Sequence, residues 1–267
     1  YLKESLKNLK ERRQDAEKEA EKKKVAPVYP TAEQLRAEDD EEAPSVFLTV
    51  TDEAGRVVRN INGSGSKGIA RASWDLRYPA PVLSGPSGDG DDEPEGGALV
   101  MPGKYLVSLS KRVGGTATKL AGPQPFTVTV EGTSVMKPED RFALHEFQQK
   151  VSKLQRAVSG AIQLANDLKS RLSSIKKALQ ETAAPVEPLL NQASTLEART
   201  NEMLRALRGD ATLRSRNENT LPSISDRVNT IVDDERLSTS HPTQTHRESY
   251  GLAGELFASE LQKLRQV

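Results

Sequence analysis

The sequence has no cysteine, few aromatic residues, no net charge and no long apolar run, and each shortage excludes a class of protein. Without cysteine, neither a disulfide framework nor a thiolate zinc site can form. Basic and acidic residues number 38 each, so no net field draws the chain to nucleic acid or to an acidic membrane. No apolar run reaches the length of a bilayer, so we predict no membrane span.

A hydrophobic fraction of 35% and an aromatic fraction of 4% are lean for a globular enzyme. This composition is typical of long helices and of a small sheet, each of which buries only one stripe or one face. The chain begins at Tyr1 rather than at methionine, so we expect it to be a fragment of a longer protein.

The most regular stretch runs from Glu139 to Glu181, directly after Pro138. Its apolar residues recur at alternating spacings of three and four, which is typical of an α-helix packed along other helices. At about 1.5 Å per residue such a helix spans on the order of 60 Å, too long to be buried inside a compact globule. We therefore expect partner helices to cover it. Its apolar positions are Leu144, Phe147, Val151, Leu154, Val158, Ala161, Ala165, Leu168, Leu172, Ile175 and Leu179.

The segments that follow repeat this spacing and predict a helical bundle over 137–267. The first two helices are joined by a short turn, which implies a long antiparallel helical hairpin. Ser223, with Asp226 three residues later, has the pattern of a helix start, and Thr243 or Thr245 is expected to cap the last helix. The predicted helices cover 139–181, 186–208, 223–236 and 244–266.

The first half of the chain divides into a charged helix with an extended linker over 1–43 and a strand-rich region over 44–132. Alternating apolar residues between glycine-containing turns indicate about six short strands, and these predict an Ig-like antiparallel β-sandwich. The fold class is therefore α+β with several domains. An acidic, glycine-rich stretch over 84–98 is expected to be a disordered loop. The predicted strands cover 43–51, 56–61, 68–77, 104–111, 116–120 and 126–130.

No group of residues has the pattern of a catalytic centre, and we assign no catalytic, cofactor-binding or metal-binding residue. A two-carboxylate hydrolase needs paired acids in a concave site. The best single acid, Asp75, is expected instead to bond to the backbone or to Arg77. The order of the acidic residues in the 84–98 loop does not match an EF-hand, although a calcium role for that loop stays open. His145 is expected on the surface or flank of its helix, and neither His241 nor His246 has a carboxylate at metal-ligand spacing.

Several short motifs appear in a fixed order and resemble a known family. An Ig-like module similar to that of the flagellar hook-capping protein is indicated by Val57–Arg59, Gly68–Ile69, Trp74–Pro79 and Met101–Tyr105. With Pro123–Phe126, Leu154–Val158 and Ser238–His246, the order resembles bacterial sortilin-like β-propeller proteins of the BNR (Asp-box) type, labelled glycosyl hydrolases. The structural motif residues are Trp74, Asp75, Arg77, Pro102, Gly103 and Tyr105.

The resemblance implies a propeller followed by a charged helix, an Ig-like module and a helical bundle. The propeller signature Ser-x-Asp-x-Gly-x-x-Trp does not occur in this sequence, so no catalytic carboxylate is carried over. The family implies a secreted, periplasmic or cell-envelope location. Expected partners are a β-propeller of the same parent protein, another envelope protein or a second copy.

Two functions are carried forward from the sequence. The first is a non-catalytic structural and protein-interaction region that docks through its helix seam and sandwich. The second is an accessory, substrate-contacting part of a glycoside hydrolase whose catalytic propeller lies outside this chain, with contacts expected at the 84–97 loop and at Trp74–Tyr78. The predicted interaction residues are Leu154, Val158, Leu168, Leu172, Ile175 and Leu179.

Overall fold

The computed structural model describes residues 1–26, 29–81, 96–132, 136–183, 185–237 and 240–264. The chain divides into two units. The first unit comprises Tyr1–Tyr78 and Pro102–Gly132, and the second comprises Pro79–Met101 and Thr133–Val267. The predicted 84–98 loop lies largely outside the described residues, so the structure does not test whether that loop binds calcium. The fold is α+β, with a four-stranded antiparallel sheet and a long helix accompanied by shorter ones.

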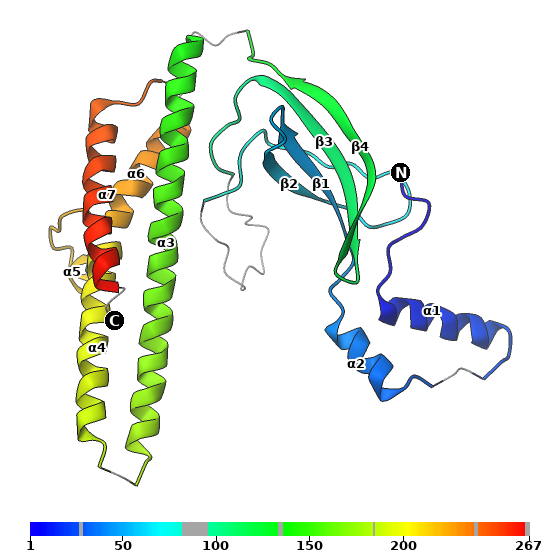
Figure 1. Ribbon diagram of the computed structural model, residues 1–267, viewed down its shortest axis with the longest axis horizontal. Coiled ribbons are helices and arrows are strands. Elements are labelled where there is room, and N and C mark those ends of the chain that lie inside the picture. The colour runs from blue at the N-terminus through cyan, green and yellow to red at the C-terminus, as the bar shows by residue number, and fades with distance from the viewer. Residues whose placement is uncertain (27–28, 82–95, 133–135, 184, 238–239, 265–267) are drawn as a thin grey trace. The chain divides into compact units, whose positions relative to one another are not determined.

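The first unit is built on an antiparallel sheet with the strand order β2-β1-β3-β4 (Figure 1). Val46, Val50, Val58 and Tyr105 are its buried side chains. The first turn forms around Gly55, whose φ of +77° suits glycine, and Asp52 Oδ1 accepts a hydrogen bond from Arg56 N at 2.9 Å. The strands are β1 (Ser45–Asp52), β2 (Val57–Gly63), β3 (Gly103–Val113) and β4 (Thr116–Val128).

The segment Gly68–Arg77 was predicted as a strand and is not one. Asp75 Oδ1 accepts a hydrogen bond from Arg77 N at 3.0 Å, and Trp74 Nε1 donates to Arg77 O at 3.0 Å. These local bonds fold the segment into a turn, in which Leu76 has a φ of +57°. The segment therefore lays Trp74 on the sheet instead of adding a strand to it.

The two strands predicted over 116–120 and 126–130 form one strand, β4, with a bulge. Gly122 sits at the irregularity with a φ of +93°, and a Cβ there would lie 2.6 Å from the carbonyl oxygen of Val107. Only glycine fits so close to the neighbouring backbone, so the strand continues past this point where the sequence suggested a break.

Two helices complete the first unit, α1 (Leu9–Lys22) and α2 (Ala32–Asp40). Asn8 and Glu11 form a capping box at the start of α1, and Thr31 and Gln34 form one at the start of α2. Helix α2 lies in the region that the sequence analysis assigned to an extended linker.

The second unit consists of α3 (Pro138–Gln180), α4 (Glu187–Arg208), α5 (Ala211–Ser215), α6 (Ile224–Leu237) and α7 (Gln244–Leu264). The predicted long helix is confirmed as α3, which packs against α4, α6 and α7. In Figure 1, α4 runs beside the C-terminal half of α3, while α6 and α7 lie beside its N-terminal half.

The predicted helix starts in this unit are also confirmed. Ser223 N donates to Asp226 Oδ2 at 3.0 Å, and Asp226 N donates back to Ser223 Oγ at 3.1 Å. At α7, Thr243 Oγ1 accepts from His246 N at 3.2 Å. The short α5 was not predicted, and Asp210 caps it through Thr212 N and Leu213 N.

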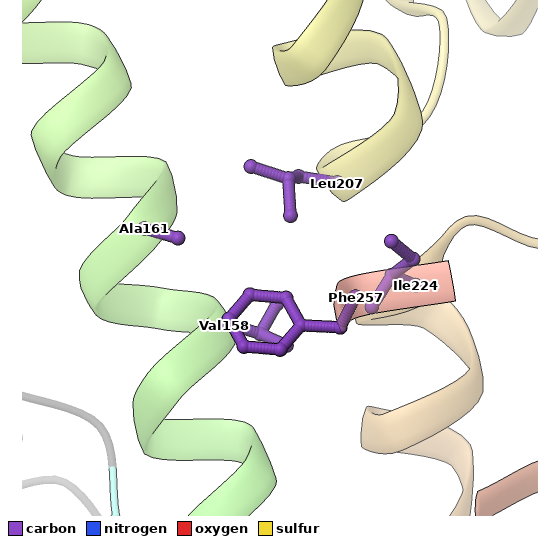
Figure 2. Close-up of a cluster of buried hydrophobic side chains, with 5 residues drawn as sticks. All are labelled: Val158, Ala161, Leu207, Ile224 and Phe257. Atoms are coloured by element: carbon purple, nitrogen blue, oxygen red, sulfur yellow. The ribbon is translucent and has the colours of Figure 1, made fainter. Parts of the chain in front are cut away.

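Two apolar clusters hold the second unit together, and both use the N-terminal half of α3. The first joins α3, α4, α6 and α7 (Figure 2), and its side chains converge from all four helices. The second joins α3, α6 and α7 beside the edge-on ring pair of Phe147 and Tyr250, whose centroids lie 5.7 Å apart. The buried members are Val158, Ala161, Leu207, Ile224 and Phe257 in the first cluster, and Val151, Val228, Ile231 and Ala253 in the second.

Candidate interaction surface

Beyond these clusters, α3 and α4 continue together as a two-helix arm, which we define as residues 163–180 of α3 and 187–204 of α4. The arm has its own narrow seam, in which Ala165 and Leu172 of α3 are buried. Lys176 Nζ on α3 donates to Glu197 Oε2 on α4 at 2.8 Å, which lowers the pKa of Glu197 and ties the helices together. From α4 the seam buries Ala193, Thr200, Met203 and Leu204.

The predicted interaction residues divide between the two parts of α3. Val158 and Leu172 are buried, and Leu154 packs against both apolar clusters, so these three are used inside the chain. Leu168 and Leu179 are half-buried. Ile175 is 50% exposed, although the sequence placed it in the seam. Its spacing fits the seam, but the side chain that bonds to α4 at this point is that of the next residue, Lys176.

Leu164 is also 49% exposed, and it was not among the predicted residues. Leu164, Leu168 and Ile175 follow one another at spacings of four and seven, so they share one face of α3. We call these three residues the arm stripe. Leu168 and Ile175 belong to the apolar spacing that the sequence shows, and Leu164, four residues before Leu168, is the one stripe residue outside it.

The charges of the arm are segregated between its helices. Residues 163–180 of α3 contain four basic side chains and one acidic one, whereas residues 187–204 of α4 contain three acidic side chains and one basic one. The arm stripe therefore lies on a basic helix. Its exposed neighbours Lys169 and Arg171 favour a partner with acidic side chains around an apolar contact.

Of the structural motif residues of the first unit, Tyr105 is buried, Trp74 is half-buried against it and Asp75 is exposed. The Trp74 ring lies edge-on to Tyr105 and to Phe126, with centroids 6.0 and 6.1 Å apart. Pro102 and Gly103 lead into β3, and Arg77 and Asp75 close the turn that carries Trp74. Burial of Tyr105 raises the pKa of its hydroxyl to about 12. The prediction that Asp75 bonds to the backbone is confirmed.

A hollow lies in the first unit between α1 and α2, with a volume of about 490 Å³. Its walls are mainly alanine and aliphatic side chains, including Ala16, Ala20 and Ala37. Arg13 bridges the helices through Glu38, with Nε to Oε1 at 2.6 Å and Nη2 to Oε2 at 2.9 Å. This paired geometry is structural, because it holds two short helices that bury little apolar surface.

The three histidines have other neighbours in the described residues than a metal-binding group. Burial is the main cause that lowers the pKa of His145, which contacts the backbone of Leu99. His241 contacts Arg247, and His246 lies between Asp234 and Glu235. In the described part of the chain, no group of three or more His, Cys, Asp or Glu side chains is arranged to hold a metal ion.

None of the described helices is both long enough and apolar enough to cross a bilayer. Comparison with known proteins gives no match, whether to protein-family models, to curated proteins or to solved structures. The arm stripe is thus the candidate interaction surface on the evidence of its own geometry.

Proposed function

We propose that this chain is a non-catalytic structural and protein-interaction region of a larger secreted or envelope protein, and that it docks through the arm stripe. The observation that carries the proposal is the half-exposed pair Leu164 and Ile175, which lie on one face of α3 within the arm. Burying apolar surface contributes about 25 cal/mol per Å², so covering this face favours association.

In this proposal α3 and α4 act as an antiparallel helical hairpin that projects from the bundle. The sheet of the first unit serves as an Ig-like module that follows the β-propeller along the parent chain. The sequence motifs support this arrangement through their order. The partner surface is apolar at its centre and acidic at its rim, because the arm stripe lies among basic side chains.

The alternative, that the chain contacts the substrate of a glycoside hydrolase, has less support. Sugar-binding modules stack substrates on exposed aromatic rings, and the Trp74 ring packs on Tyr105 and Phe126 instead. The other segment proposed for such contacts, 84–97, lies largely outside the described residues.

The test compares binding of the purified chain and of a Leu164→Glu, Ile175→Glu double variant to the propeller region of the parent protein, by calorimetry. Both substitutions are on half-exposed positions, so the helices should stay folded while docking is lost. The matched control is Ile69→Glu with Leu221→Glu, at positions that are 86% and 87% exposed and do not belong to the arm.

We expect the control pair to bind like the unaltered chain and the arm double variant to lose most of its binding. Light scattering of each protein reports at the same time whether a second copy takes the place of the propeller. Undiminished binding by the arm variant would exclude the arm stripe as the docking surface. A monomer that binds no propeller would exclude the interaction function, and turnover of a glycoside by the chain alone would exclude a non-catalytic role.

A further inference from the structure

Glu235, near the end of α6, carries a buried carboxyl group that the proposed function does not use. The residue is 6% exposed, and its Oε1 atom has no hydrogen-bond partner among the described residues. A carboxylate in such a place is costly unless a counter-charge or a proton accompanies it. The nearest group able to supply either is the imidazole of His246 in the first turn of α7, whose Nδ1 lies 3.6 Å from Oε1.

His246 is held between two carboxyl groups that are neighbours on α6. Its Nε2 lies 3.3 Å from Oδ2 of Asp234, on the opposite side of the ring from Glu235. Its Nδ1 is buried and has no hydrogen-bond partner among the described residues. The Thr243 cap fixes the backbone of His246, so the ring is directed at α6 by the start of α7 itself.

The number of protons in this cluster decides how many contacts it can satisfy. A neutral imidazole has one N–H and can donate to only one of the two carboxylates. With one more proton on the ring, the imidazolium donates from Nε2 to Asp234 and from Nδ1 to Glu235. If that proton lies on Glu235 instead, the neutral carboxylic acid donates to Nδ1. Without that proton, two adjacent carboxylates remain and one of them has no donor.

No basic side chain in the described part of the chain is paired with the Glu235 carboxyl group other than His246. Among the described residues, the ionisable groups in contact with Glu235 are Asp234 and His246. Helix α3 presents the uncharged Gln148, whose Nε2 donates to the backbone oxygen of Glu235 at 3.5 Å. Arg247 of α7 lies against the ring of His241, and Arg236 of α6 is exposed.

We propose that Glu235 and His246 form a proton-dependent latch that fastens the end of α6 to the first turn of α7. The latch is closed while the shared proton is present and is released when the proton is lost. Burial, with a further contribution from Asp234, raises the pKa of Glu235 to about 7 from 4.5, which agrees with release in the neutral range. This inference does not depend on the proposed docking function.

The sign of the pH dependence follows from the direction of this shift. Because the pKa of Glu235 is higher in the folded chain, its contribution to stability is complete below its ordinary value of 4.5. The contribution is lost as the pH rises through about 7. Between these two pKa values each pH unit weakens the closed state about tenfold relative to the released one, and above about 7 there is no further change.

The experiment measures amide hydrogen exchange of the whole chain at about pH 6 and about pH 8.5, corrected for the intrinsic pH dependence of exchange. Protection at residues 233–237 and 244–248 should fall at the higher pH, while amides in the arm serve as an internal reference. In Glu235→Gln the amide cannot titrate, so this pH-dependent loss should disappear. In His246→Asn protection should be low at both pH values.

A matched control is Asp234→Asn, which removes the exposed carboxylate but leaves the buried pair, so its pH-dependent loss should persist. A carbon-13 titration of the Glu235 carboxyl in the unaltered chain tests the latch without any substitution. Titration near the ordinary glutamate value would overturn the proposal, as would equal loss of protection in the unaltered chain and in Glu235→Gln.

Discussion

The side-chain amide of Gln155 on α3 donates a hydrogen bond to Oδ1 of Asn229 on α6, with a nitrogen–oxygen distance of 3.0 Å. Gln155 is buried within the apolar seam, and its Oε1 has no hydrogen-bond partner among the described residues. Between Leu154 and Val158, the buried face of α3 therefore carries a polar side chain, Gln155, on the side of α6. This bond satisfies the Nε2 group of the buried Gln155 amide but not its Oε1 atom. Removing Gln155 and removing Asn229 should therefore change the free energy of unfolding by different amounts.

This asymmetry predicts opposite effects for two substitutions. Asn229→Ala leaves the whole Gln155 amide buried and unpaired, which should lower the free energy of unfolding by about 1–3 kcal/mol. Gln155→Met keeps the shape and removes both polar atoms, so it should change that energy by less than about 1 kcal/mol. Denaturant unfolding followed by circular dichroism measures both. The interpretation is wrong if Gln155→Met costs as much as Asn229→Ala.

A second prediction concerns the cluster shared by α3, α6 and α7. Ile231 is 1% exposed and contacts the buried members of that cluster, so Ile231→Ala should lower the free energy of unfolding by about 2–5 kcal/mol. Leu221→Ala removes the same kind of side chain from a position that is 87% exposed, and its effect should stay within about 0.5 kcal/mol. Equal melting temperatures for the two variants would contradict this assignment of the core.

The helices of the second unit could be predicted from the sequence because a long amphipathic pattern has one physical solution. Each apolar residue from Leu144 to Leu172 needs a cover, and the spacing of three and four defines the covered face. The prediction of a buried side chain is wrong at Ile175, which is 50% exposed. At this point only α4 accompanies α3, and one neighbouring helix covers a narrower face than several do. Spacing along one helix does not report how many neighbours it has.

The first unit was predicted less well, for reasons that lie in single residues. A short apolar run such as Gly68–Arg77 does not distinguish a strand from a turn that delivers one large side chain. Here the Asp75 carboxylate accepts a hydrogen bond from the backbone N–H of Arg77, which favours the turn over a strand. The Glu235–His246 pair was also beyond sequence reasoning, because its two residues meet only when α6 and α7 pack together.

A third prediction uses the hydroxyl of Tyr105. Burial raises its pKa to about 12 from an ordinary value of 10.0, with smaller contributions from Tyr78 and Asp52. The protonated hydroxyl therefore stabilises the first unit fully below pH 10, and this contribution is lost as the pH rises through about 12.

Titration of phenolate absorbance should show a late step that is missing in Tyr105→Phe. The same substitution should flatten the fall in stability between about pH 10 and pH 12, provided that the ring contacts with Trp74 and Phe126 are kept. If Tyr105→Phe instead removes a titration step near the ordinary pKa of tyrosine, the Tyr105 hydroxyl is solvated and the conclusion that it is buried is wrong.

The last prediction asks whether the two units hold separate cores. Leu172 is buried in the arm seam and Leu168 is half-buried beside it, so a Leu168→Asp, Leu172→Asp variant places two carboxylates in or next to the seam between α3 and α4. Burying even one unpaired charge costs several kcal/mol, so the helices should loosen and the helical circular dichroism signal should fall.

The single tryptophan, Trp74, lies in the first unit against Tyr105 and Phe126, so its fluorescence reports on that unit alone. We expect the Trp74 unfolding transition to stay where it is while the helical transition moves to lower temperature. Ile175→Asp, at a half-exposed position on the same helix, is the matched control and should cost less than about 1 kcal/mol. Full helicity in the double variant would contradict the seam, and a joint shift of both transitions would mean that the two units unfold as one because their cores depend on each other.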